Sequence, residues 1–167
     1  MSQRISLICC DQDLLNAAID SDQSLGIHLE CNVANAWNSF GPGALTNSLK
    51  NLIDDPDSYN WRAHFVLHEK DHCIIGNGGY KGPPDAKGKV EIGYEISPGY
   101  RNQGYATEMV GLLVNKADRD HRIKKILAYT LSTYNASTRV LRKQGFIKTS
   151  GIEDAENGWI WRWELER

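Results

Sequence analysis

The stretch from Val90 to Glu108 constrains the fold more than any other part of the chain, because it reads as a strand, a glycine-containing loop and the start of a helix. The apolar, β-branched run ends at Ser97-Pro98-Gly99, since proline cannot donate to a strand ladder and disfavours helix in the residue before it. From about Gln103 to Asp118 the spacing is helical, through Ala106, Met109, Val110, Leu113, Val114 and Ala117. We therefore expect a strand ending near Ser97 and an amphipathic helix after it.

The loop between these two elements has the properties of an anion-binding site. Free N–H groups at a helix start point outward with the positive end of the helix dipole, and Gly99 and Gly104 allow a ligand to approach the backbone. Arg101 can add a charge-assisted hydrogen bond, so a pyrophosphate would fit here. The alternative is a plain connection in which the glycines only make the turn.

The string Arg101-Asn102-Gln103-Gly104-Tyr105-Ala106 matches the pattern Gln/Arg-x-x-Gly-x-Gly/Ala between a strand and a helix. In this the sequence resembles the GNAT superfamily of acyl-CoA-dependent N-acetyltransferases. Upstream, Glu91-Ile92-Gly93-Tyr94, and downstream, residues 136–146, resemble the branch containing the ribosomal-protein acetyltransferases RimJ and RimL. The resemblance is strong from about residue 62 to 147 and looser at both ends.

Length, charge and cysteine usage bound the remaining possibilities. A chain of 167 residues that is 41% hydrophobic suits one domain, residues 1–167. A net charge of −2 with interspersed signs gives little support for nucleic acid binding. Without an 18-residue apolar run or a signal peptide, we expect no membrane association and a cytoplasmic protein. The four cysteines form no Cys-x-x-Cys pair, so we expect no metal site and mostly buried, reduced thiols.

The order of periodic segments predicts a three-layer α/β (α+β) domain. The expected strands are residues 5–9, 62–69, 73–80, 90–97, 125–130, 146–149 and 159–165. The first expected helix starts at Asp11 or Asp13, and the others lie around 34–37, around 45–53, at 103–118 and at 136–144. In the last strand Trp159, Trp161, Trp163 and Leu165 share one face, which is typical of core. The resemblance implies a mixed, mostly antiparallel sheet of six to seven strands with about four helices. It also implies that the strand at residues 90–97 and the next strand splay apart, and that the gap between them holds the pantetheine arm.

Acetyl transfer to an amine requires a base, because amines are mostly protonated at neutral pH. Glu91 is the first candidate: it lies where several GNAT members place a base, and its apolar neighbours would raise its pKa. Glu95, two residues further on the same face, is the reserve. The alternative for Glu91 is a solvent-facing glutamate or one paired with a lysine.

The departing thiolate needs a proton, for which Tyr134, Ser137 and, less plausibly, Cys73 are candidates. Tyrosine stays protonated at working pH because its ordinary pKa, about 10, exceeds that of a thiol, about 8.5. The resemblance implies an Asn three residues before the serine, where Tyr134 stands here, so Asn135 is the candidate CoA ligand. Alternatively, Asn135 or Ser137 simply caps the following helix.

The resemblance implies acetyl-CoA as cosubstrate and direct transfer in a ternary complex. Backbone groups of Ile96 and Ser97 would hold pantetheine as an added strand, and the whole expected set is Ile96, Ser97, Arg101, Asn102, Gln103, Gly104, Tyr105, Ala106 and Asn135. The acceptor would be a protein N-terminus or a small-molecule amine, in a pocket from residues 25–60 and the last hairpin, with Trp37, Phe40, Tyr59 and Trp61 as candidate walls. We expect a monomer or homodimer.

Two other classes of function fit parts of this sequence. One is a noncatalytic acyl-CoA-binding or regulatory module that has kept the phosphate loop and lost transfer. The other is a nucleotide-phosphate binder using the same loop, which the absence of a Gly-Lys-Ser/Thr string disfavours.

Overall fold

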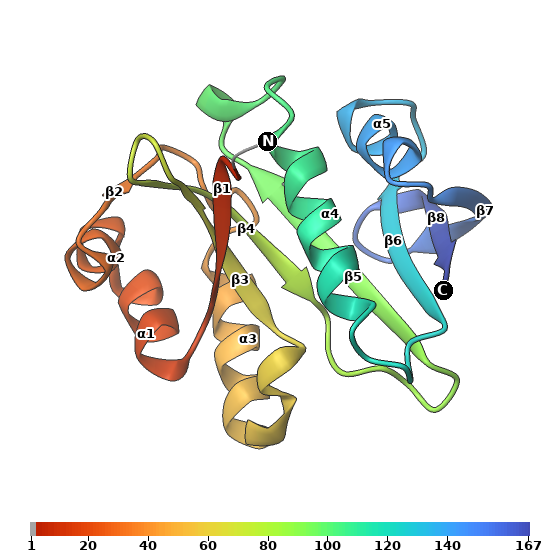
Figure 1. Cartoon of the computed structure of the whole chain (residues 1–167), viewed down its shortest axis with the longest axis horizontal. Coiled ribbons are helices and arrows are strands. Elements are labelled where there is room, and N and C mark those ends of the chain that lie inside the picture. The colour runs from red at the N-terminus through yellow and green to blue at the C-terminus, as the bar shows by residue number, and fades with distance from the viewer. Residues whose placement is uncertain (1–2) are drawn as a thin grey trace.

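The sheet is continuous across the molecule (Figure 1), and the computed structural model describes residues 3–167 apart from the side chain of Tyr59. Its strand order is β1-β3-β4-β5-β6-β8-β7, with β2 pairing to β4. Within the described residues the β2–β4 and β5–β6 pairs are parallel and the other pairs are antiparallel. The strands are β1 (Ile5–Cys9), β2 (Asn32–Val33), β3 (Ala63–His68), β4 (Cys73–Tyr80), β5 (Lys89–Ile96), β6 (Lys125–Leu131), β7 (Ile147–Asp154) and β8 (Gly158–Glu166).

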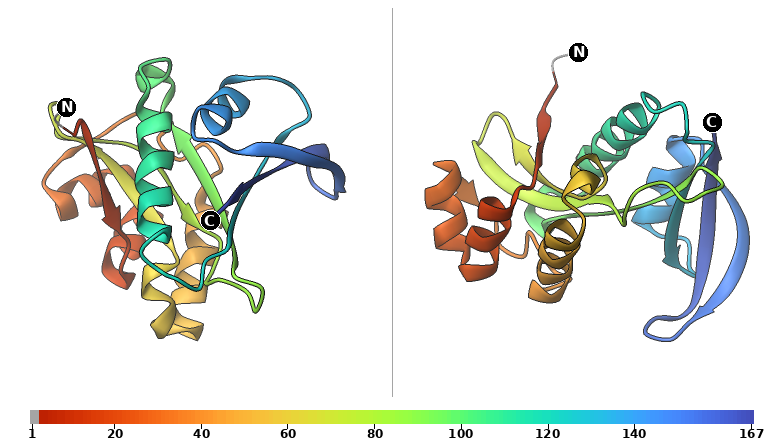
Figure 2. Two further views of the ribbon diagram at one scale, coloured as in Figure 1. Left: turned by 45° about the vertical axis from the view of Figure 1, so that its right-hand side comes forward. Right: turned by 90° about the horizontal axis from the view of Figure 1, so that it is seen from below.

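Helices cover both faces of this sheet (Figure 2). They are α1 (Gln12–Asp20), α2 (Asp22–Leu29), α3 (Pro42–Asp54), α4 (Tyr105–Ala117) and α5 (Ala136–Lys143), with short 3₁₀ turns at Pro56–Asn60 and Pro98–Tyr100. On one face α1, α2 and α3 bury a cluster that includes Leu15 and Phe65. On the other face α4 and α5 bury a larger cluster that includes Met109 and Trp163. The predicted three-layer α/β architecture is thereby confirmed.

The N-terminal region differs from the prediction in two helices. The expected helix around residues 34–37 is absent: Ala36 has a φ of 53°, in the left-handed region that interrupts a helix. The apolar spacing there instead serves Trp37, whose buried ring packs on Phe65 at 4.8 Å and whose Nε1 donates to Asp22 at 2.8 Å. α2 is not among the predicted helices; Ser21 caps it by accepting a hydrogen bond from the backbone N–H of Ser24.

The predicted helix start at Asp11 is confirmed, because its side chain accepts a hydrogen bond from Leu14 N at 2.8 Å. The two-residue β2 brings the sheet to eight strands, and α2 adds a helix to the expected set. The last strand buries only part of its predicted apolar face: Trp163 is buried, Trp161 and Leu165 pack against the core, and Trp159 is 57% exposed.

Candidate active site

β5 and β6 pair only along their first residues and then diverge. The pairs are Lys89 with Lys125, Val90 with Ile126 and Glu91 with Leu127. Beyond them β5 stays paired with β4 as far as Ile96, and β6 stays paired with β8 as far as Leu131. We call the region between residues 92–96 of β5 and 128–131 of β6 the fork. One edge of β5 at the fork has no strand partner within the described residues.

The hydrogen-bond pattern of β5 shows which backbone groups face the fork. Glu91 O accepts from Lys81 N at 2.9 Å and Ser97 N donates to Ile75 O at 2.7 Å, so the odd-numbered residues bond to β4. Because backbone groups alternate in direction along a strand, Tyr94 and Ile96 point theirs toward the fork. Of the expected pair, Ile96 is therefore suitably oriented, whereas the N–H of Ser97 is used within the sheet and its hydroxyl donates to Asn35 O.

An exposed loop leads from the end of β5 to the start of α4. Arg101, Asn102, Gln103 and Gly104 are all exposed, and Asn102 and Gly104 have φ values of 61° and 88°. Gly104 is the residue before α4 and no side chain caps this helix. The N–H groups of its first turn, with the positive end of the helix dipole, are thus directed out of the protein beside the fork.

Three side chains of the predicted signature stabilise this loop. Arg101 Nε donates to Ile96 O at 2.8 Å, so its guanidinium holds the loop against the end of β5 while the rest of the side chain is exposed. Tyr105 is buried, and its hydroxyl hydrogen-bonds His68 Nε2 at 2.8 Å. Ala106 is half-buried against the core. Tyr105 and Ala106 therefore offer a ligand their backbone rather than their side chains.

Glu95 has a buried, fully engaged carboxylate. It accepts hydrogen bonds from Ser39 N at 3.0 Å, from Ser39 Oγ, from Phe40 N at 3.5 Å and from Asn77 Nδ2 at 2.9 Å. These bonds fix the turn at residues 35–40 against the sheet. Glu95 thus serves the fold, which makes the reserve candidate a poor base.

Glu91 differs from Glu95 although the two lie on the same face of β5. It is half-buried at the root of the fork, which is the closed end where β5 and β6 still pair. Within the described residues its carboxylate accepts no hydrogen bond. Burial raises the pKa of Glu91, and the nearby Lys81 ammonium partly opposes this. A carboxylate with free lone pairs and a raised pKa is suited to accept a proton.

Further polar side chains, not singled out in the sequence, surround Glu91. Tyr129 has its pKa raised by burial, with an opposing effect from Arg162 and a smaller supporting one from Glu91. Lys81 lies across Gly93, since a β-carbon added there would be 3.7 Å from its Nζ. The signal available in the sequence was the period-two alternation of residues 125–131, which places Tyr129 on the face opposite the core.

The other face of the fork carries a pair of hydroxyls. Tyr94 OH lies 2.9 Å from Ser137 Oγ and donates to Ser137 O at 3.2 Å. Burial raises the pKa of Tyr94 to about 12, partly offset by the hydrogen bond to Ser137. The phenol is therefore neutral at physiological pH and joins β5 to the start of α5.

The remaining predicted groups lie differently. Asn135 forms a capping box: its side chain accepts from Thr138 N at 3.1 Å, and Thr138 Oγ1 accepts from Asn135 N at 2.9 Å. Tyr134 is 67% exposed, packs edge-on against Trp161 with 4.8 Å between the ring centroids, and accepts a hydrogen bond from Lys148 Nζ at 3.3 Å. Cys73 is buried at the start of β4, next to Tyr100.

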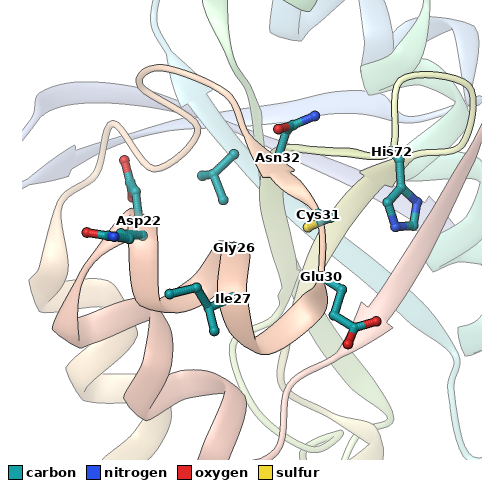
Figure 3. Close-up of a pocket in the computed structure, with 9 residues that line it drawn as sticks. Asp22, Gly26, Ile27, Glu30, Cys31, Asn32 and His72 are labelled. Carbon is teal, nitrogen blue, oxygen red and sulfur yellow. The ribbon is translucent and has the colours of Figure 1, made fainter.

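The aromatic residues expected to wall an acceptor pocket lie mostly in the core. Trp37 and Trp61 are buried in the two core clusters, Phe40 is 69% exposed next to the contacts of Glu95, and the side chain of Tyr59 lies outside the described residues. A shallow hollow of about 580 Å³ between α2 and β2 is lined by Asp22, Ile27, Glu30, Cys31 and His72, among others (Figure 3). None of its lining residues belongs to β5, β6 or α4.

Two further findings concern residues 3–167. No group of three or more His, Cys, Asp or Glu side chains is arranged to hold a metal ion. No helix has the length and apolar character needed to cross a membrane.

Comparison with known proteins gives one consistent result. The acetyltransferase (GNAT) domain family model matches residues 15–147. The N-acetyltransferase YjdG of Bacillus subtilis, itself uncharacterized, is 26% identical over 147 residues, covering 87% of this chain and 88% of YjdG.

Among solved structures, RimL, a ribosomal L7/L12 α-N-protein acetyltransferase in complex with coenzyme A, superposes with a TM-score of 0.73 and 13% identity over 99% of this chain and 95% of that one. A chimera of the Vibrio cholerae spermidine N-acetyltransferase SpeG and hSSAT superposes with a TM-score of 0.70 and 11% sequence identity. The match covers 98% of this chain and 95% of the chimera. The family uses acetyl-CoA. The chain therefore belongs to the GNAT acetyltransferase family and is an acyltransferase.

Proposed function

We propose that this acetyltransferase transfers the acetyl group of acetyl-CoA directly to a primary amine in a ternary complex. The observation that carries the proposal is the fork. An unpaired edge of β5 leads through an exposed loop to the start of α4, which no side chain caps. Glu91 lies on the face of the sheet opposite α4, at the closed end of the fork where β5 and β6 still pair.

The donor side of the fork fits a pantetheine amide and a pyrophosphate. An extended ligand can add to the edge of β5 by hydrogen bonds to the backbone of Tyr94 and to the N–H of Ile96, whose carbonyl is bonded to Arg101; this mode of binding needs no particular side chain. A pyrophosphate can accept from the N–H groups of Gly104, Tyr105 and Ala106, where the helix dipole favours negative charge. Acetyl-CoA, when bound, supplies the thioester carbonyl and a thiol leaving group.

The acceptor side begins at Glu91. An α-amino group has an ordinary pKa near 8 and an alkyl amine near 10.4, so the acceptor must lose a proton before it attacks. Glu91 takes this proton, directly or through a water molecule, and its raised pKa brings it nearer to the pH at which a base is most effective. Both protein N-termini and small amines fit this chemistry.

The proton for the departing sulfur comes from the Ser137 hydroxyl, with Tyr94 as its partner. In this step the bond between the acetyl carbon and the sulfur breaks, the sulfur takes the Ser137 proton as Tyr94 passes its own proton to Ser137 Oγ across the 2.9 Å contact, and the Tyr94 phenolate regains a proton from solvent. Tyr134 is disfavoured for this role because its side chain is exposed and its hydroxyl contacts Lys148 rather than the Tyr94–Ser137 pair.

The test is a calorimetric titration of the purified protein with acetyl-CoA, with ATP as the control, followed by a free-thiol assay with spermidine and with short peptides carrying a free N-terminus. Saturable micromolar binding of acetyl-CoA but not ATP, together with acceptor-dependent thiol release, is the expected result. Binding without turnover on any amine would favour the noncatalytic acyl-CoA-binding alternative. The absence of binding at millimolar acetyl-CoA would refute the proposal.

A further inference from the structure

We propose that Arg4 is a positioning residue for the acetyl-CoA loop, acting through Glu108 and Gln103. The inference rests on the proposed function, because it assigns a role to a residue around the same loop. Arg4 lies about a hundred positions from the signature in sequence, just before β1, and nothing in the sequence motif includes it.

Arg4 makes a set of contacts that all converge on residues 103–108. Its Nη1 donates to Gln103 O at 3.0 Å, its Nε donates to Glu108 Oε2 at 3.0 Å, and its guanidinium lies over the ring of Tyr105 at 4.5 Å. A β-carbon added at Gly104 would be 3.3 Å from its Nη2. One side chain thus contacts the loop, the residue before α4 and the first turn of α4.

The backbone of β1 strengthens this connection. Glu108 Oε1 accepts from Arg4 N at 2.9 Å and from Ile5 N at 3.3 Å, so both carboxylate oxygens are held by the start of the chain. β1 is itself an edge strand paired with β3. The loop is therefore tied to the far end of the sheet rather than only to β5.

Within the loop, Gln103 is held less firmly than Arg101, whose Nε donates to Ile96 O at 2.8 Å. Gln103 Nε2 donates to Gly99 O at 3.4 Å, and the loop borders a hollow of about 750 Å³ lined in part by His68, Lys70 and Tyr100. Without the guanidinium, residues 103 and 104 have room to move into that hollow. Arg4 keeps them in the conformation that directs the N–H groups of α4 outward.

Charge compensation is the second part of the role. Glu108 lies in the first turn of α4, where its negative charge opposes a pyrophosphate bound at the same helix end. The salt bridge with Arg4 neutralises that charge. Removing Arg4 alone leaves an uncompensated carboxylate one turn from the proposed anion.

If Arg4 only stabilised the fold, its loss would lower the melting temperature without a specific effect on acetyl-CoA binding. The Arg4 side chain is 47% exposed, and exposed ion pairs contribute little to stability. Loss of Arg4 should therefore change acetyl-CoA binding more than it changes unfolding.

The experiment compares wild type with Arg4→Ala, Arg4→Lys and the double variant Arg4→Ala/Glu108→Gln, measuring the Kd of acetyl-CoA, the KM and kcat, and the Tm. Arg122→Ala is the matched control, because Arg122 is exposed and pairs with Asp120 beyond the opposite end of α4. Its Kd should equal that of wild type.

We expect Arg4→Ala to raise Kd and KM about tenfold with kcat nearly unchanged, as for loss of a charge-assisted contact. The Kd and KM of Arg4→Lys should fall between those of wild type and Arg4→Ala, because lysine keeps the positive charge but lacks the planar guanidinium group. The double variant should bind acetyl-CoA more tightly than Arg4→Ala.

An Arg4→Ala protein with the Kd of wild type would overturn the inference, as would a fall in Tm without a change in Kd. A double variant that binds no better than Arg4→Ala would overturn the charge-compensation part. A wild-type protein that does not bind acetyl-CoA would instead refute the proposed function, so the two failures are distinguishable.

Discussion

At the scale of single residues, the two glutamates on one face of β5 are separated in role by their partners. Glu95 has four donors around it and holds the turn at residues 35–40. Glu91, at the root of the fork, has none within the described residues and a raised pKa. The position of Glu91 in the strand favours it in the sequence, but the contacts of Glu95 leave no local signal, because they come from residues 18 to 56 positions away.

Substituting Glu91 with Gln should lower kcat by roughly 10²- to 10³-fold and leave the Kd of acetyl-CoA unchanged, because only proton transfer is lost. The raised pKa means that the folded state binds the proton more tightly than the unfolded state. Its stabilising contribution is present below the unfolded pKa, about 4.3, and is lost as pH rises through the folded pKa.

At pH 7 the Glu91→Gln protein should therefore melt at the same temperature as wild type or above it, with the difference vanishing near pH 4. Steady-state kinetics, calorimetry and melting curves at the two pH values give the answer. A variant with full kcat would remove Glu91 from the mechanism.

Substituting Glu95 with Ala should destabilise the fold by about 2–4 kcal/mol, because buried donors of Ser39 and Asn77 lose their acceptor. Chemical denaturation measures this directly. Glu91→Gln is the control, since it changes a carboxylate on the same strand face that accepts none of these bonds. Equal stability of the two variants would contradict the assignment.

At the scale of elements, the fork is held open on one side by α5. Tyr94 from β5 contacts Ser137 in the first turn of α5, and the Asn135–Thr138 capping box fixes where that helix begins. The cap explains why Asn135 is a poor candidate for a CoA ligand through its side-chain oxygen. The helix that carries the proposed proton donor, Ser137, is therefore positioned by β5 itself.

Ser137→Ala should lower kcat about 10²-fold or more, the usual minimum for loss of a proton donor, and Tyr94→Phe should lower it less, because the Ser137 hydroxyl remains and Phe keeps the ring packed against the core. The double variant should lose little beyond Ser137→Ala, since the two hydroxyls act together. Thiol release under single-turnover conditions measures the chemical step. Tyr134→Phe is the control and should be unaffected; a large loss there would transfer the role to Tyr134.

Most elements were predictable from the sequence because their signals are local. The predicted strands at 62–69 and 73–80, the end of β5 before Pro98 and the amphipathic pattern of α4 each depend on neighbouring residues. The spacing at residues 34–37 failed as a helix signal because Trp37 is placed by a distant partner, Phe65, rather than by its own helix. For the same reason Tyr94–Ser137 and the contacts of Arg4 could not be predicted.

At the scale of the whole molecule, β4, β5 and α4 meet at Gly78. A β-carbon there would collide with Gly93 O and lie 2.5 Å from Met109 Cε. The close approach of α4 to the sheet, and hence the position of its N-terminus beside the fork, depends on this small residue. The periodicity of β4 gave no sign of it.

Gly78→Ala should destabilise the protein by at least ~2 kcal/mol, as overpacking against backbone does. Gly43→Ala is the matched control: nothing lies within 4 Å of the added carbon, and Ala favours the helix, so this variant should be neutral or slightly stabilising. Urea unfolding of both variants measures their free energies of unfolding and tests this prediction. A Gly78→Ala protein as stable as wild type would show that α4 can shift without cost.

The strand order has a consequence for synthesis on the ribosome. The strands β1 to β5, with α1 to α3, come from one continuous stretch of chain and can assemble as it emerges. β8 is made last yet lies between β6 and β7, so the second half of the sheet cannot close before residues 158–166 have left the exit tunnel. Nascent chains should thus form the loop at residues 97–104 early and complete the fork only once β8 has emerged.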